Sequence, residues 1–194
     1  MTPSARGYSL VELAFVLGIV ATTCGIAIPQ ARATLDDMRA LGAVRYVSTR
    51  LHETRMEAVR RSRHTAIRFT SLEQRYIFRI YTDGNNNGVR SADIQSGVDP
   101  ALRPPERLSD QFADVDFGTL PGLPAVDPSS SPPGSDPIRV GTSRMVVFTA
   151  LGTATPGSLY VRSRRAQYVV RIFGETGKIR ILRFNERTGT WTAL

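Results

Sequence analysis

The most informative part of the sequence lies near its N-terminus, where residues 6–29 read RGYSLVELAFVLGIVATTCGIAIP. Residues 8–28 are apolar or small and carry a single charge, at Glu12. As an α-helix this segment is roughly 30 Å long, about the thickness of a bilayer core. An ionised side chain is costly in such a segment and usually has a function there. The stretch therefore predicts an apolar helix in which the carboxylate of Glu12 has a specific role.

The helical pattern continues beyond Pro29, although a proline lacks an N–H group and loosens or kinks the helix around it. Past this point apolar residues recur at steps of three and four, and arginines occupy the other faces. We expect one helix over residues 8–62, apolar all round at 8–28 and amphipathic at 29–63. It would be roughly 80 Å long, too long for a domain of this size to bury. Its first half must sit in a membrane or against other copies of the chain.

After residue 62 the side-chain period changes to two, which predicts strands. Six short strands are expected over residues 65–70, 75–81, 144–149, 158–162, 167–173 and 178–184. Residues 100–137 form a Pro-rich insertion that holds most of the 12 prolines, and within it residues 129–134 predict a turn-rich connector with little core potential. The predicted fold class is α+β, a long N-terminal helix packed on an antiparallel β domain at residues 64–194.

Composition narrows the function classes. A chain of 194 residues has room for one ordinary domain and an extension, and 41% hydrophobic residues exclude wholesale disorder. One cysteine excludes an internal disulfide framework, and two distant histidines exclude a zinc-finger site. The formal net charge is +8, and arginine supplies all but one of the 25 basic side chains. No nucleophile and base have the spacing of a catalytic pair, so we expect no enzyme.

The N-terminal segment resembles a known signal. Residues 6–13, Arg-Gly-Tyr-Ser-Leu-Val-Glu-Leu, are similar to the class III signal of type IV pilins and type II secretion pseudopilins, with Tyr8 where phenylalanine is commoner. Pro29 falls where that family has its helix-breaking proline. The C-terminal half is similar to the H-type minor pseudopilin (GspH/FimT-like) domain, through residues 145–149, 156–159, 164–166, 168–170 and 177–180. The resemblance implies a pilin-like fold.

The resemblance also implies a processing route and a location. Residues 1–7 would be a leader that a prepilin peptidase removes after Gly7, and the new amino terminus at Tyr8 would be methylated. Glu12 would then meet that amine on a neighbouring pilin or pseudopilin subunit, because an adjacent ammonium offsets the cost of a carboxylate in low dielectric. The chain would be a single-pass protein of the bacterial inner membrane, with its β domain in the periplasm.

Two functions follow from the resemblance. The first is a minor pseudopilin, a structural subunit of the type II secretion pseudopilus that requires no cofactor. The second is a minor type IV pilin that binds DNA during uptake, since residues 177–180 are similar to a Gly-Arg-x-Arg segment of such pilins. Lys178, Arg180 and Arg183 would then attract phosphates from one sheet edge, although such arginines are more often a solvated face. A third interpretation is a secreted β protein with a cleaved signal peptide and a mature start at Thr34.

A separate pattern occurs at residues 83–93, which read DGNNNGVRSAD. Oxygen-bearing side chains alternate and a glycine follows, as in the front half of a calcium-binding loop. The closing glutamate of an EF-hand is absent, because Ile94 holds its place. The alternative interpretation is an Asn/Gly-rich turn after a strand. The sequence thus leaves both open, and a weak Ca²⁺ site would take oxygen ligands from Asp83, Asn85, Asn87, Val89 (carbonyl) and Asp93.

Overall fold

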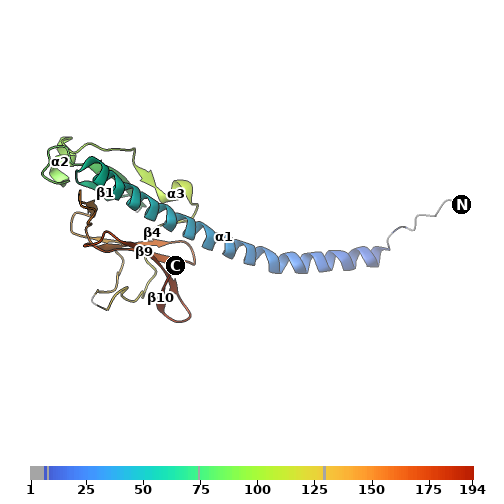
Figure 1. The fold of residues 1–194 in the computed structure, drawn as a ribbon. Helices are drawn as coiled ribbons and strands as arrows, with labels where there is room; N and C mark the ends of the chain where they lie inside the picture. The colour runs from blue at the N-terminus through green and yellow to red at the C-terminus, as the bar shows by residue number, and fades with distance from the viewer. Residues whose placement is uncertain (1–6, 8, 74, 129) are drawn as a thin grey trace. The chain divides into compact units, whose positions relative to one another are not determined.

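The computed structural model describes residues 7, 9–73, 75–128 and 130–194. It divides the chain into two compact units, residues 1–35 and 36–194. One helix, α1 (Leu10–Arg61), contributes to both units and is helical without a break at Pro29 (Figure 1). The predicted helix is confirmed to within two residues at its described start and one at its end. Its predicted first residue, Tyr8, lies outside the described residues.

Unit 36–194 contains two antiparallel sheets. The first sheet has the strand order β3-β2-β1-β6, and the second has the order β10-β9-β8-β7-β4, with β5 also paired to β7. The elements that follow α1 are β1 (Thr65–Leu72), β2 (Arg75–Thr82), α2 (Ser91–Ser96), β3 (Glu106–Arg107), α3 (Leu108–Gln111), β4 (Asp116–Phe117), β5 (Ile138–Val140), β6 (Met145–Phe148), β7 (Gly157–Arg162), β8 (Gln167–Ile172), β9 (Ile179–Asn185) and β10 (Thr190–Ala193). The α+β fold class is therefore confirmed, and all six predicted strands are present.

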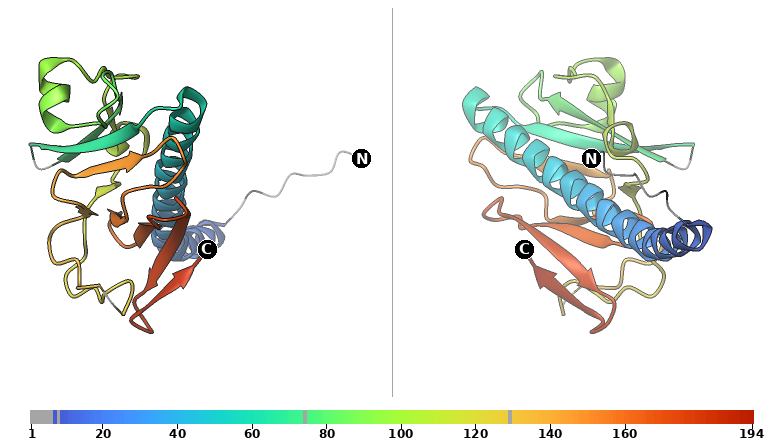
Figure 2. Two further views of the ribbon diagram at one scale, coloured as in Figure 1. Left: turned by 60° about the vertical axis from the view of Figure 1, so that its left-hand side comes forward. Right: turned by 90° about the vertical axis from the view of Figure 1, so that its right-hand side faces the viewer.

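Residues 36–61 of α1 cross both sheets and close the main core (Figure 2). The helix face that touches the sheets is made of small or branched residues, among them Ala40, Ala43, Val44, Val47 and Leu51. They lie at steps of three and four, so the side chains share one face. Aromatic and aliphatic residues of both sheets complete this core. The sheets also touch directly, because the ring of Phe117 in the second sheet packs edge-on against Phe69 of the first, with 5.3 Å between the ring centroids.

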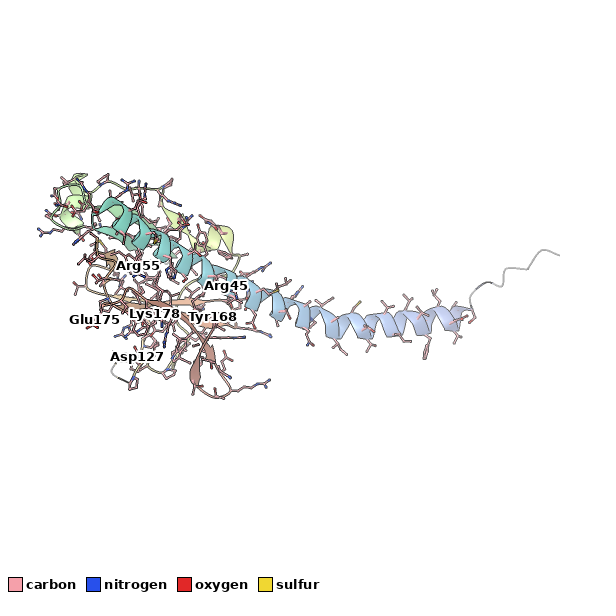
Figure 3. All side chains as sticks on the ribbon, in the orientation of Figure 1. Arg45, Arg55, Asp127, Tyr168, Glu175 and Lys178 are labelled. Atoms are coloured by element: carbon pink, nitrogen blue, oxygen red, sulfur yellow. The ribbon has the colours of Figure 1, made fainter. Side chains whose placement is uncertain are left out.

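The β6–β7 and β8–β9 turns both contact the side chain of Arg55. Arg55 of α1 donates from Nε to the carbonyl of Gly152 at 3.0 Å. Gly177 has a φ of +59°, and a Cβ there would lie 2.2 Å from the same carbonyl oxygen and 3.0 Å from Arg55 Nε. Glycine is therefore required at this position, both for its conformation and for the close approach of the two turns. Figure 3 shows Arg55 on α1 above the part of the β domain that carries Glu175 and Lys178.

The Pro-rich insertion at residues 100–137 also contributes to the core, through residues that precede the 129–134 connector. Leu108, Val115, Phe117 and Leu123 are buried, and β3, α3 and β4 lie within this segment. Gln167, which is almost fully buried, accepts a hydrogen bond from the Leu120 amide through Oε1 and donates to three carbonyls through Nε2. The segment covers one face of the second sheet. Its apolar residues are separated by prolines and turns, so no helical or strand period revealed them.

Candidate functional site

The apolar half of α1 has no partner within the described chain. Its large side chains are exposed, namely Leu10, Val11, Leu13, Phe15, Val16, Leu17, Ile19, Val20, Ile26 and Ile28. The helix is long and apolar enough to cross a membrane, and none of its most apolar window is buried. A contiguous apolar surface of this size marks a site that meets a membrane or another protein.

Glu12 occupies a defined position at the start of α1. Ser9 precedes the helix, and its Oγ accepts a hydrogen bond from the Glu12 amide at 3.2 Å. The Leu13 amide donates to the Ser9 carbonyl at 3.1 Å. Ser9 is thus the N-cap and Glu12 is at the third helical position, the spacing of a capping box. This Ser-x-x-Glu spacing is visible in the sequence, although the resemblance to pilins assigns Glu12 an assembly role alone.

The assembly role of Glu12 and the processing role of Gly7 and Tyr8 stay predictions. Gly7 has open space around its Cα, and the side chain of Glu12 is exposed. The amine that would pair with Glu12 belongs to Tyr8, which lies outside the described residues. Pro29, the other predicted assembly residue, leaves α1 unbroken rather than ending it.

The 83–93 loop is organised by two buried carboxylates. Asp83 is 1% exposed, and its oxygens accept hydrogen bonds from the amides of Asn85, Asn86 and Gly88 at 3.2, 2.7 and 2.7 Å. Asp99 accepts from the amides of Gly84 and Arg90 at 3.0 and 2.9 Å. Such bonds satisfy backbone N–H groups that the tight turn leaves without partners. Asp99 lies outside the loop pattern, so the sequence did not reveal its part in the turn.

The other predicted calcium ligands, Asn85, Asn87, Val89 and Asp93, make few hydrogen bonds with one another. Asn85 Nδ2 donates to Asp93 Oδ2 at 3.5 Å, and Asn85 Oδ1 accepts from the Asn87 amide at 3.3 Å. Val89 is buried and packs in a small apolar cluster with Ala66 and Met145. Among the described residues no group of three His, Cys, Asp or Glu side chains is placed to hold a metal. The Ca²⁺ site stays a prediction, and the loop has a structural role with or without it.

The three predicted DNA-binding residues do not share one surface. Lys178 and Arg180 are exposed, and the guanidinium of Arg180 lies 5.6 Å from the ring centroid of Phe173. Arg183 is three residues further along β9 and points to the opposite face, because side chains alternate along a strand. There its Nη2 pairs with Asp37 Oδ2 of α1 at 2.6 Å. The expectation of three cations clustered at one sheet edge was wrong for Arg183.

Two polar links between α1 and the second sheet have no signal in the sequence. Asp36 Oδ2 accepts from Ser163 Oγ at 2.7 Å and from the Arg165 amide at 3.2 Å. Ser163 Oγ accepts in turn from the Ala166 amide at 3.0 Å. With the Asp37–Arg183 pair, these bonds tie the first turn of the helix in this unit to the β7–β8 turn and to β9. Their partners are more than 120 residues apart in sequence, so no local pattern marks them.

The long helix with an exposed apolar half and the antiparallel β domain define an α+β protein. The family model described as Type II transport protein GspH matches residues 43–176. Because this match covers more than half of the chain, the protein belongs to the GspH family, as the resemblance predicted.

Curated proteins include no match to the chain. Among solved structures, the chain is similar to the crystal structure of the minor pseudopilin EpsH from the type II secretion system of Vibrio cholerae. The TM-score is 0.39 at 13% sequence identity, with 80% of this chain and 93% of that chain covered.

Proposed function

We propose that this protein is a minor pseudopilin, a structural subunit of a type II secretion pseudopilus. The observation that carries the proposal is the coincidence, in one chain, of a GspH domain at residues 43–176 and an exposed apolar helix at residues 10–28. The family indicates the secretion system, and the exposed apolar surface requires a membrane or neighbouring subunits to cover it. No catalytic step and no cofactor are part of this proposal.

In this proposal α1 has two successive environments. Before assembly, residues 10–28 cross the inner membrane and the β domain faces the periplasm. A prepilin peptidase removes residues 1–7, and the methylated amine of Tyr8 becomes available. In the filament, the apolar surfaces of neighbouring helices pack together, and Glu12 pairs with the amine of the adjacent subunit. The pairing offsets the desolvation of both charges, so it also selects the axial register between subunits.

The decisive experiment separates the charge of Glu12 from its capping role. Glu12→Gln keeps the capping-box spacing with Ser9 but removes the negative charge. We expect this variant to be inserted and processed normally, but to be lost from filaments recovered with sibling subunits. Ser9→Ala is the matched control, because it weakens the cap by about 1 kcal/mol and leaves the carboxylate in place.

Mass spectrometry of the wild-type protein tests the processing step directly. We expect a mature protein that begins with methylated Tyr8. Normal incorporation of Glu12→Gln, or working assemblies whose subunits still carry residues 1–7, would overturn the proposal. A mature start at Thr34 would indicate a cleaved secretory signal instead.

A further inference from the structure

The first sheet has an outer face that carries an unusual set of arginines. Ile67 and Phe69 of β1, with Phe78 and Ile80 of β2, point into the main core. The alternate residues of the same strands therefore point to the opposite face. We call this surface the arginine face and define it by Arg68, Arg75, Ile77, Arg79 and Arg107. Its members are half-buried, except for the exposed Arg75.

Strand register brings these side chains together. Arg68 of β1 lies directly opposite Arg79 of β2, and Ile77 of β2 lies directly opposite Arg107 of β3. Arg75 and Arg79 are two residues either side of Ile77, so they share its face. Directly opposed side chains in an antiparallel pair have Cβ atoms about 5 Å apart, and like charges in this position destabilise the sheet. The arrangement thus costs folding stability and needs another explanation.

In the described part of the chain, no acidic side chain forms an ion pair with the arginines of this face. Within the described residues, ion pairs occur at eight other arginines, but at none of Arg68, Arg75, Arg79 and Arg107. The carboxylate of Asp116 attracts Arg75 and Arg107, although it forms no ion pair with either. Arg79 donates from Nε to the Arg103 carbonyl at 3.0 Å, which holds its planar group in place.

We infer that the arginine face binds an acidic surface of another protein. The planar guanidinium fork matches carboxylates and forms paired, charge-assisted hydrogen bonds with them. Ile77, half-buried at the centre of the arginines, and Leu72, exposed beside Arg75, supply apolar contact. Arginine combined with apolar residues is typical of protein–protein interfaces. Carboxylates of a partner would relieve the repulsion between Arg68 and Arg79. The like charges that lower the stability of the unbound protein would therefore also favour binding.

The composition of the face favours a protein over a nucleic acid. Tyr81, two residues after Arg79 on β2, shares this face, packs on the apolar cluster of Ala66, Val89 and Met145, and lies against Arg79. It is therefore not free to stack on a base, as single-stranded nucleic acids require. A duplex backbone that crosses the face would also approach the carboxylate of Asp116.

The test uses the full chain in a non-ionic detergent and a fluorescent 20-residue polyglutamate peptide as the probe. Anisotropy measured at low salt should show binding that weakens as salt is added. The Arg68→Gln/Arg79→Gln variant should bind about tenfold more weakly or worse, because two charge-assisted contacts are lost. Lys178→Gln/Arg180→Gln is the matched control, since it removes the same charge from the second sheet and should bind like the wild type.

A second readout distinguishes a binding surface from a structural one. Removal of one opposed charge in Arg68→Gln should leave the melting midpoint unchanged or raise it, whereas a structural arginine would lower it. If the double variant folds poorly, Arg75→Gln at the exposed end of β2 tests the same face.

Three results would overturn the inference: absence of peptide binding by the wild type, equal losses in both double variants, or tighter binding of a 20-base-pair DNA that depends on Arg68 and Arg79. The inference does not depend on the pseudopilin proposal, because failure of Glu12→Gln and failure of these variants are measured separately.

Discussion

At the scale of single residues, Asp83 illustrates how a motif can have a structural explanation. Its carboxylate satisfies three backbone amides of the tight turn that follows β2, and Asp99 satisfies two more. The residue types that suit a calcium loop are also those that suit such a turn, because both need oxygen acceptors close to the backbone. The spacing in the sequence is the same in both cases, so spacing alone does not distinguish the turn from the ion site.

Asp83→Ala should lower the free energy of unfolding by about 2 kcal/mol, because buried amides lose a charged acceptor. Asp93→Ala is the control, since this side chain makes one long contact, at 3.5 Å, and should change stability little. Chemical denaturation checks both variants. A loss from Asp93→Ala as large as that from Asp83→Ala would contradict the structural role assigned to Asp83.

Calcium is tested by the melting midpoint of the wild type with Ca²⁺ and with a chelator. If the loop binds the ion, the midpoint rises with Ca²⁺, because a ligand that binds only the folded state stabilises it. The rise should disappear in both Asp83→Ala and Asp93→Ala. An unchanged midpoint in the wild type would remove the calcium prediction.

Asp116 gives the chain a pH-dependent stability. Burial raises the pKa of its carboxyl group, while the bond from the Phe117 amide and the charge of Arg75 act in the opposite direction. The unfolded pKa is about 3.9, so the folded state binds more protons between that value and the raised pKa. The ionised carboxylate therefore costs stability as pH rises through this window, and the full cost is present above the raised pKa.

Asp116→Asn should raise the melting midpoint at pH 7 and leave it unchanged at about pH 3, where the wild-type carboxyl is already protonated. Asp110→Asn, at an exposed position in α3, is the control and should have little effect at either pH. Thermal melts at both pH values check the prediction. A lower midpoint for Asp116→Asn at pH 7 would mean that attraction to Arg75 and Arg107 outweighs burial.

At the scale of elements, the amphipathic half of α1 is held by polar bonds at one end and by apolar packing along its length. Ser163→Ala should cost about 1–3 kcal/mol, because Asp36 loses one donor and the Ala166 amide loses its acceptor. Ser143→Ala, at an exposed site between β5 and β6, is the control and should be neutral. Urea denaturation measures both. Equal effects would show that the link between α1 and the β7–β8 turn does not contribute.

At the scale of the whole molecule, the proline-rich segment is part of the fold. Leu123, Tyr160 and Val169 form a second apolar cluster on the face of the second sheet that points away from α1. Trp191 of β10 joins it and donates from Nε1 to the Pro124 carbonyl at 3.2 Å. Without this cover, the second sheet would expose one apolar face to solvent.

Leu123→Ala should therefore lower the free energy of unfolding by about 2–3 kcal/mol, through lost burial and the cavity that remains. Leu151→Ala is a control with the same chemistry, since Leu151 is 91% exposed and should contribute almost nothing. A neutral result for Leu123→Ala would mean that this part of the segment is only a connector.

The sequence predicts those elements whose residues repeat with a local period. The apolar run at residues 10–28, the three- and four-residue steps of α1 and the alternation in β1, β2, β8 and β9 carry enough local information to locate each element. The short strands β3, β4 and β5 have two or three residues each, too few for a period to appear.

The candidate sites divide in the same way. The predictions for Gly7, Glu12 and Pro29 rest on their spacing alone, because a linear signal is contained in consecutive residues of the chain. The Asp36–Ser163 link, the separation of Arg183 from Arg180 and the opposition of Arg68 to Arg79 depend on strand register and on which face each side chain occupies. Register is set by the packing of the whole core, since a shift of one residue would turn every side chain to the other face. The sequence by itself therefore determined which residues form local signals and elements. Only the tertiary structure determined which side chains share a surface, because strand register and facing depend on long-range packing.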